Sequence, residues 1–297
     1  MAFYLGLDCG GTSTRAMVID EDGQVVFEGR SGPANWASTD REQLLLHLRL
    51  ALQGQPKVDR ACACFAGLLT EQDAQEASVA LSAIAEAPAI ARPDFHAALS
   101  AAGDSATCCV IAGTGSLVFS QLEGKTVKGG GGGPLLGDQG SAFALGRDAL
   151  QIALFGSAVV AAVSERFMEK CEELFGTRDA SEIPARIYRE PSPAARVAKL
   201  TPTVAEDFAS GEEYARTVIT NQMRQLAYIV HGHLSAYHQS RRPWSVRLTG
   251  GLWDISDVFL AQFETHFRLM AGGKDAVIAR LERPPVFGAA LIAKQSS

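Results

Sequence analysis

Short apolar runs that end in polar, glycine-rich turns organise the first hundred residues. Residues 5–7 and 16–19 are apolar, and an acid, two glycines and several hydroxyl side chains lie between them. This pattern predicts a β-hairpin with a polar tip. The segments that follow predict strands over residues 24–30, 61–66 and 89–91 and helices over residues 41–52, 71–85 and 95–102. The order β-β-β-α-β-α-β-α predicts an α/β domain in which helices cover a sheet and ligands bind at the carboxyl ends of strands.

The same pattern restarts near residue 106. An apolar run over residues 107–112 leads into Gly113-Thr114-Gly115-Ser116, and strands are predicted over 117–121 and 126–128. Because a strand, a glycine-rich tip and a second strand occur twice, the sequence predicts two domains of similar topology. The remaining predicted elements are helices over residues 141–155, 158–175, 181–188, 194–199, 212–239 and 255–267, a strand over 245–248, and an apolar final helix over 286–294.

Each predicted hairpin has the chemistry of a phosphate-binding site. Glycine can adopt positive φ and lets a ligand approach the backbone, and successive N–H groups in such a turn bind anions. In the first hairpin Asp8 lies where it could hold a hydrated Mg²⁺. A plain hairpin with no ligand is the alternative, because no helix follows the glycines as it does in a P-loop. The candidate phosphate contacts are Gly10, Gly11, Thr12, Ser13, Arg15, Gly113, Thr114, Gly115 and Ser116.

Composition narrows the class of protein. The chain has 297 residues, 47% of them hydrophobic, and a formal net charge of −6. A negative charge argues against a broad nucleic-acid surface. No apolar run approaches the ~20 residues of a membrane span, and no basic segment precedes an apolar one as in a signal peptide. The six cysteines form no CxxC pair, so we expect buried thiols in a reducing, cytoplasmic environment.

Four motifs together resemble one family. Asp8-Cys9-Gly10-Gly11-Thr12, 112–116, 137–142 and 249–251 occur in this order. The chain resembles the BadF/BadG/BcrA/BcrD ATPase family and, within it, the N-acetylglucosamine and glucosamine kinases of the actin, Hsp70 and sugar-kinase superfamily. The resemblance implies two duplicated ribonuclease-H-like domains around a nucleotide cleft that closes on MgATP. It also implies that the final helix returns to the first domain, which would span residues 1–105 and 285–297, with the second spanning 106–284.

The resemblance implies a role for each matched residue. Asp8 would be the metal-associated acid, and Gly250 and Gly251 would lie against the nucleoside of ATP. Asp94 would be the catalytic base, which takes the proton of the accepting hydroxyl. Relatives are often homodimers, and no stretch of this chain identifies an interface. The implied contacts to a small amino-sugar substrate are Asn35, Trp36, Gly67, Asp94 and Asp138.

Simpler interpretations stand beside several of these roles. Asp94 could cap the helix that begins at Phe95, and Asp138 could cap the helix that follows residue 140. The chain also departs from its relatives around the acceptor. Pro93 and Phe95 flank the acid where a polar and a small residue are usual, and the glycine run 129–133 lacks the usual tryptophan. These departures bear on the identity of the acceptor more than on ATP binding.

Three functions remain open from the sequence. The first is an ATP-dependent kinase that phosphorylates a hydroxyl of N-acetylglucosamine or glucosamine. The second is an ATPase that activates a partner enzyme through an iron–sulfur cluster, which would need a cysteine at a dimer interface. The third is a non-catalytic protein that binds ATP or sugar. The presence of Asp8, Asp94 and Asp138 favours the kinase.

Overall fold

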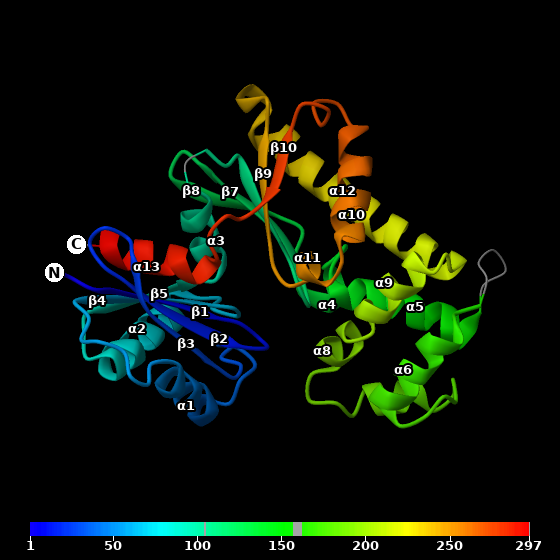
Figure 1. Cartoon of the computed structure of the whole chain (residues 1–297), viewed down its shortest axis with the longest axis horizontal. Coiled ribbons are helices and arrows are strands. Elements are labelled where there is room, and N and C mark those ends of the chain that lie inside the picture. The colour runs from blue at the N-terminus through cyan, green and yellow to red at the C-terminus, as the bar shows by residue number, and fades with distance from the viewer. Residues whose placement is uncertain (104, 157–161, 297) are drawn as a thin grey trace. The chain divides into compact units, whose positions relative to one another are not determined.

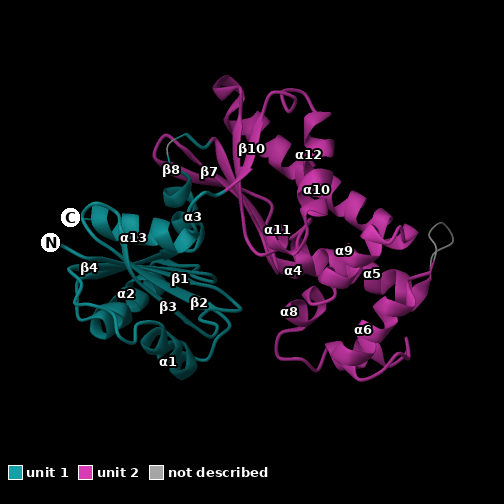
Figure 2. Cartoon of the chain, in the orientation of Figure 1, with its two compact units in different colours: residues 1–106, 281–297 teal, residues 107–280 magenta. Residues whose placement is uncertain are grey.

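A computed structural model describes residues 1–103, 105–156 and 162–296, which fall into two compact units (Figure 1). Unit 1 comprises Met1–Ala106 and Leu281–Ser297, and unit 2 comprises Thr107–Arg280 (Figure 2). The boundaries expected from the sequence, after residue 105 and before residue 285, lie close to this division. The chain therefore leaves unit 1 once and comes back to it at the end.

Unit 1 is built on a five-stranded sheet in the order β3-β2-β1-β4-β5. β1, β2 and β3 are antiparallel neighbours, whereas β4 and β5 run parallel to β1. The carboxyl ends of β1, β4 and β5 therefore meet at one edge of the sheet. The strands span Tyr4–Cys9 (β1), Thr14–Ile19 (β2), Val25–Ser31 (β3), Arg60–Phe65 (β4) and Ala89–Pro93 (β5).

Helices cover both faces of this sheet (Figure 1). α1 (Arg41–Ala51) and α2 (Glu71–Ala85) pack on one face, and α3 (Phe95–Ala102) and α13 (Pro285–Gln295) pack on the other. Two glycines let α13 lie directly on its neighbours. A Cβ at Gly6 would lie 2.2 Å from the Ala290 nitrogen, and one at Gly288 would lie 2.0 Å from the Ala97 oxygen. The final helix is thus an integral part of unit 1.

Unit 2 repeats the topology of unit 1. Its sheet has the order β10-β9-β6-β7-β8, in which β6, β7 and β8 are antiparallel neighbours and β9 and β10 run parallel to β6. This match confirms the predicted α/β fold class with duplicated domains. The strands span Cys108–Ala112 (β6), Ser116–Leu122 (β7), Lys125–Gly129 (β8), Ser245–Thr249 (β9) and Val277–Arg280 (β10).

The helices of unit 2 lie mainly between β8 and β9, and two predicted ranges need correction. The predicted helix 158–175 is α6, which begins at Glu165, and residues 158–161 lie outside the described residues. The predicted helix 255–267 is α12, which begins only at Asp257, because extended Ser256 accepts the Val258 N–H and caps it. The helices are α4 (Gly133–Leu136), α5 (Ala142–Phe155), α6 (Glu165–Phe175), α7 (Ile183–Ile187), α8 (Pro193–Ala198), α9 (Thr201–Ala209), α10 (Glu213–Tyr237), η1 (Gln239–Arg241), α11 (Leu252–Ile255) and α12 (Asp257–Arg268).

The burial of the cysteines agrees with the sequence. All six cysteines are buried, and within the described ranges no helix is both long and apolar enough to cross a bilayer. Burial raises the pKa of the Cys109 thiol to about 12, and it also raises the pKa of Cys9 and Cys108. These thiols serve as small apolar side chains of the core.

A buried hydroxyl and two imidazoles connect β7 to the end of α10. The Ser120 Oγ lies 2.7 Å from Nε2 of His233 and 2.7 Å from Nε2 of His238. Since a hydroxyl carries one proton, one imidazole accepts from Ser120 and the other donates to it. Burial lowers the pKa of His233 to about 4, with a further contribution from His238, and burial also lowers the pKa of His238. Burial therefore favours the neutral form of both rings.

We expect His233 to lower the free energy of unfolding as the pH decreases from about 6.5 to about 4. In this window a histidine is protonated in the unfolded chain while folded His233 is not, so the unfolded state binds more protons at this group and acid favours it. This contribution of His233 to the free energy of unfolding is about 3 kcal/mol at most. Urea unfolding at several pH values should show that His233→Gln loses less stability than the wild type as the pH falls. An unchanged slope in His233→Gln, or an equal loss in the control His231→Gln, would contradict the assignment.

Candidate active site

The first predicted phosphate site is a tight turn between β1 and β2. The Gly10 N–H donates to the Ser13 oxygen at 3.0 Å, and the Gly10 oxygen accepts from Ala34 at 3.0 Å. Gly10 and Gly11 are not among the described glycines with positive φ, so the expected reason for glycine is corrected. A Cβ at Gly11 would meet nothing within 4 Å. Glycine therefore keeps the tip open to a close ligand rather than enabling the turn.

A row of charged side chains crosses one face of the unit 1 sheet at its carboxyl edge. Asp8 on β1 lies opposite Arg15 on β2, and Arg15 lies opposite Arg30 on β3. Residues directly opposite each other share a face of the sheet. Cys64 on β4 is the parallel neighbour of Asp8, and Arg92 on β5 is that of Cys64. Arg30 and Arg92 were not predicted, and only the strand register reveals them.

The surroundings of the Asp8 carboxyl shift its pKa. Burial and then the nearby Asp94 carboxylate raise its pKa, the Arg15 guanidinium opposes both, and together they bring the pKa of Asp8 to about 6. A bound cation would favour the ionised form of such a group. Within the described residues no three His, Cys, Asp or Glu side chains form a metal cluster. A cation at Asp8 would therefore draw its other ligands from phosphate and water, as Mg²⁺ commonly does.

Asp94 follows β5 directly and caps α3. Its N–H donates to the Phe65 oxygen at 3.0 Å, and its Oδ1 accepts the Phe95 N–H at 2.9 Å. These bonds fix the carboxylate at the carboxyl edge of β4 and β5. Asp94 is close enough to Asp8 to raise the pKa of Asp8. The capping interpretation is thus correct as structure, and it positions the carboxylate beside the predicted phosphate site.

The predicted sugar loop is joined to the same edge. Asn35 Oδ1 accepts from the Ala37 and Ser38 N–H groups at 3.0 and 3.1 Å. Because Oδ1 is occupied, the N–H groups of the Asn35 carboxamide are the atoms that remain to donate to a ligand. Gly67 has φ of 77°, and a Cβ there would lie 2.4 Å from Asn35 Oδ1. Glycine at 67 therefore makes room for the Asn35 side chain, which is a supporting role for this predicted substrate residue.

Trp36 belongs mainly to the core. Its side chain is 5% exposed, and its ring meets Phe65 edge-on at 5.4 Å. The Arg41 guanidinium lies 3.6 Å from the ring centroid, and the indole N–H donates to Asp73 at 3.2 Å. These contacts anchor the loop that carries Asn35. The structure gives Trp36 a packing role in this loop.

The second predicted phosphate site is the turn between β6 and β7. The Gly113 N–H donates to the Gly115 oxygen at 2.8 Å, and the Gly113 and Thr114 oxygens accept from the first N–H groups of α5. Asp138 Oδ1 accepts the Ser116 N–H at 3.2 Å. A Cβ at Gly115 would lie 2.8 Å from Asp138 Oδ2. Hydrogen bonds therefore hold the turn to both α5 and Asp138.

Asp138 is 7% exposed and has φ of 64°, an uncommon conformation for a residue other than glycine. Burial raises the pKa of its carboxyl, and N–H donors from Ser116 and Gly133 oppose that rise. The predicted alternative role, a cap for the helix after residue 140, is wrong. Ser141 caps α5 by accepting the Ala144 N–H at 3.2 Å. Asp138 instead holds the turn, with its remaining lone pairs available to a ligand.

The predicted adenosine residues lie beside the second turn. Gly250 has φ of 102°, and a Cβ there would lie 2.3 Å from the Ala112 oxygen. This close approach requires glycine. A Cβ at Gly251 would meet nothing within 4 Å, so the backbone there is open. Unit 2 thus groups Gly113–Ser116, Asp138 and Gly250–Gly251, while unit 1 groups Asp8, the first turn, Asn35 and Asp94.

This arrangement matches a known family. The model of the BadF/BadG/BcrA/BcrD ATPase family matches residues 5–293. The chain belongs to this family. The match spans both units and includes every site residue described above, so the BadF/BadG/BcrA/BcrD assignment covers the whole site and not one motif.

Proteins similar to this chain carry related names. The chain is 23% identical, over 99% of each sequence, to the N-acetylmuramic acid/N-acetylglucosamine kinase of Clostridium acetobutylicum. Its fold is similar to that of a putative N-acetylglucosamine kinase from Chromobacterium violaceum, with a TM-score of 0.75, 22% identity and 99% of each chain covered. It is also similar to one from Porphyromonas gingivalis, with a TM-score of 0.76, 20% identity and 97% of each chain covered.

Proposed function

We propose that this protein is an ATP-dependent kinase that transfers the γ-phosphoryl group of MgATP to a hydroxyl of N-acetylglucosamine or glucosamine. The observation that supports it best is the pair of carboxyl groups at one sheet edge. Asp8 follows the first strand next to an open glycine turn, and Asp94 is held by two backbone bonds near enough to raise the pKa of Asp8. The names of the similar proteins point to an amino sugar as the acceptor.

The nucleotide contacts in this proposal come from both turns. The tips at residues 10–13 and 113–116 offer backbone N–H groups and hydroxyls to phosphate oxygens. The open backbone at Gly251 would lie against the nucleoside. Asp8 would hold Mg²⁺, which neutralises phosphate charge when bound. The raised pKa of Asp8 fits this role, because a bound cation would favour the ionised form of a carboxyl that burial and a second acid make harder to ionise.

In the proposed chemical step Asp94 acts as the general base. As the acceptor oxygen bonds to the γ-phosphorus, the bond from that phosphorus to the β,γ-bridging oxygen breaks and releases ADP. Asp94 takes the hydroxyl proton as the new bond forms. Asn35 donates to the acceptor from its carboxamide, and Asp138 accepts from sugar hydroxyls. No covalent intermediate with the protein is required.

The alternative function, activation of a partner through an iron–sulfur cluster, receives less support. Cluster ligands are thiolates. All six cysteines are buried, and burial raises the pKa of the Cys9, Cys108 and Cys171 thiols. These are properties of core residues rather than of ligands exposed at a dimer interface.

ADP release with a panel of acceptors tests the proposed function. We expect release with N-acetylglucosamine or glucosamine that exceeds release without acceptor at least ten-fold, and little with glucose. N-acetylmuramic acid belongs in the panel, because a similar protein carries its name. Release that is equal with and without acceptor would replace the kinase by a plain ATPase. ATP binding without release for any sugar would favour a non-catalytic protein.

A further inference from the structure

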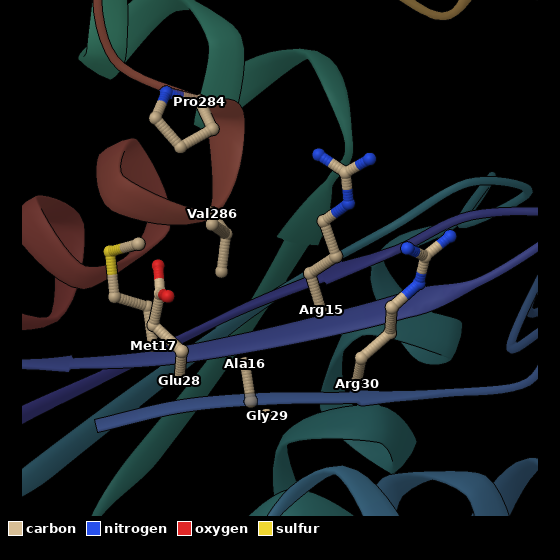
Figure 3. A pocket seen from close by; sticks show the side chains of 8 residues that line it. All are labelled: Arg15, Ala16, Met17, Glu28, Gly29, Arg30, Pro284 and Val286. Atoms are coloured by element: carbon tan, nitrogen blue, oxygen red, sulfur yellow. The ribbon is translucent and has the colours of Figure 1, made fainter.

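A pocket of about 290 Å³ lies on the unit 1 sheet where α13 begins (Figure 3). Its floor is apolar, because Met17 on β2 and Val286 on α13 belong to one buried cluster. Its rim is charged, since the side chains of Arg15, Arg30 and Glu28 extend from the strands. The lining residues are Arg15, Ala16, Met17, Glu28, Gly29, Arg30, Pro284 and Val286.

The two arginines of this rim repel each other. Arg15 and Arg30 lie directly opposite each other on antiparallel strands, an arrangement that destabilises a sheet when the charges are alike. Both side chains are exposed. Within the described part of the chain, neither guanidinium donates a hydrogen bond or forms an ion pair. Glu28 is two residues from Arg30 on the same strand and also forms no ion pair with it.

A local arrangement that costs stability is typical of a functional site. Asp8 attracts Arg15, whereas among the described residues no carboxylate forms an ion pair with Arg30. A bound anion would supply the compensation here. Arginine presents planar, paired donors that match the oxygens of a phosphate group better than they match a single-atom anion, and two arginines from neighbouring strands line this pocket. The net charge of the rim, two arginines against one glutamate, is positive. The pocket is therefore expected to favour an anionic ligand.

The lining residues other than the arginines indicate which groups the ligand carries besides its anionic group. Glu28 offers carboxylate oxygens, which accept from hydroxyl groups. Met17, Pro284 and Val286 offer apolar surface to a carbon skeleton. The volume is at the lower end for small-molecule sites, and the first turn, residues 10–13, is not part of the lining. These features fit a small hydroxylated phosphate ester and not a whole nucleotide.

We propose that this pocket binds a sugar monophosphate, with the phosphate group between Arg15 and Arg30 and the sugar hydroxyls directed to Glu28. Arg15 is thereby assigned to the pocket ligand, whereas the sequence placed it among the nucleotide contacts. The choice of a hexosamine phosphate as the probe rests on the proposed function. Binding is measured without turnover, so failure of the kinase assay and failure of this site are distinguishable.

Thermal unfolding and calorimetric titration of the whole protein test the site. The variant is Arg30→Gln, and the control is Arg49→Gln, which removes the same charge from α1 on the opposite face of the sheet. The probes are N-acetylglucosamine 6-phosphate, glucose 6-phosphate, inorganic phosphate and the magnesium complex of a non-hydrolysable ATP analogue. Without ligand, Arg30→Gln should unfold about 1 to 3 °C higher than the wild type, because the repulsion is relieved.

With sugar phosphate bound, the wild type should unfold at a higher temperature than Arg30→Gln. The wild type and Arg49→Gln should gain stability and bind the sugar phosphates, and Arg30→Gln should bind them at least ten-fold more weakly with unchanged affinity for the ATP analogue. Equal sugar-phosphate binding by wild type and Arg30→Gln would overturn the proposal. The proposal would also be overturned if Arg30→Gln weakened binding of the ATP analogue alone. That result would assign the two arginines to the nucleotide site. Inorganic phosphate binding as tightly as the sugar phosphates would overturn the assignment to a sugar.

Discussion

Asp94→Asn should lower kcat for sugar phosphorylation by about 10²- to 10⁴-fold while leaving the fold intact. Asparagine keeps the shape of aspartate and caps helices equally well, so the bond from the Phe95 N–H to the side chain survives. What is lost is the capacity to take the hydroxyl proton. The acceptor and ATP would still bind, and KM values should change far less than kcat.

The measurement is ADP release at saturating ATP and sugar, with thermal unfolding of each variant as a check on folding. Asp40→Asn is the matched control. Asp40 caps α1 as Asp94 caps α3, with its side chain accepting from Glu42 and Gln43, and it is not among the site residues. Full turnover by Asp94→Asn would remove Asp94 from the role of base. An equal loss in Asp40→Asn would show that the effect belongs to capping.

Asp8→Asn should raise stability and remove activity together. At neutral pH the folded protein must ionise a buried carboxyl whose pKa is about 6, whereas the unfolded chain ionises it at its ordinary value of 3.8. The folded state binds more protons between these values, so this group costs stability as the pH rises through that window. This difference between the folded and unfolded pKa lowers the free energy of unfolding by about 3 kcal/mol at pH 7. The neutral amide of Asp8→Asn would not have this cost.

Denaturant unfolding at pH 4 and pH 7 checks this prediction. The advantage of Asp8→Asn over the wild type should be small near pH 4 and should reach its full size above about pH 6. Mg²⁺-dependent ADP release should be lost at both values. A variant that is less stable than the wild type at pH 7 would show that the ionised Asp8 stabilises the fold. A variant that keeps its Mg²⁺-dependent activity would place the cation elsewhere.

Local patterns were sufficient to predict most of the fold. The apolar run, glycine tip and second apolar run of each hairpin depend on neighbours in sequence, so both β1–β2 and β6–β7 were found. β10 was missed because Val277–Arg280 is a short edge strand with no turn motif after it. The break between α11 and α12 was missed because it depends on the conformation of Ser256.

The site was predictable in its motifs but not in its cross-strand partners. Asp8 stands out in sequence because it ends an apolar run, and Asp94 because it matches the position of the catalytic acid in the family that the chain resembles. Arg30 does not, since its position opposite Arg15 follows only from the register of β2 with β3. The conformation of Gly10 and the burial of Trp36 likewise depend on tertiary contacts, which no local pattern contains.

The return of α13 to unit 1 has a consequence for synthesis of the protein on the ribosome. The strand that carries Gly6 is made first, and the helix that covers it is made after Thr107–Arg280. At common elongation rates this delay is on the order of 10 to 35 s. During that time one face of the first sheet is covered by α3 alone and lacks α13. The nascent first unit is therefore incomplete while the second is being made, which makes it a candidate client for chaperones that bind apolar surface.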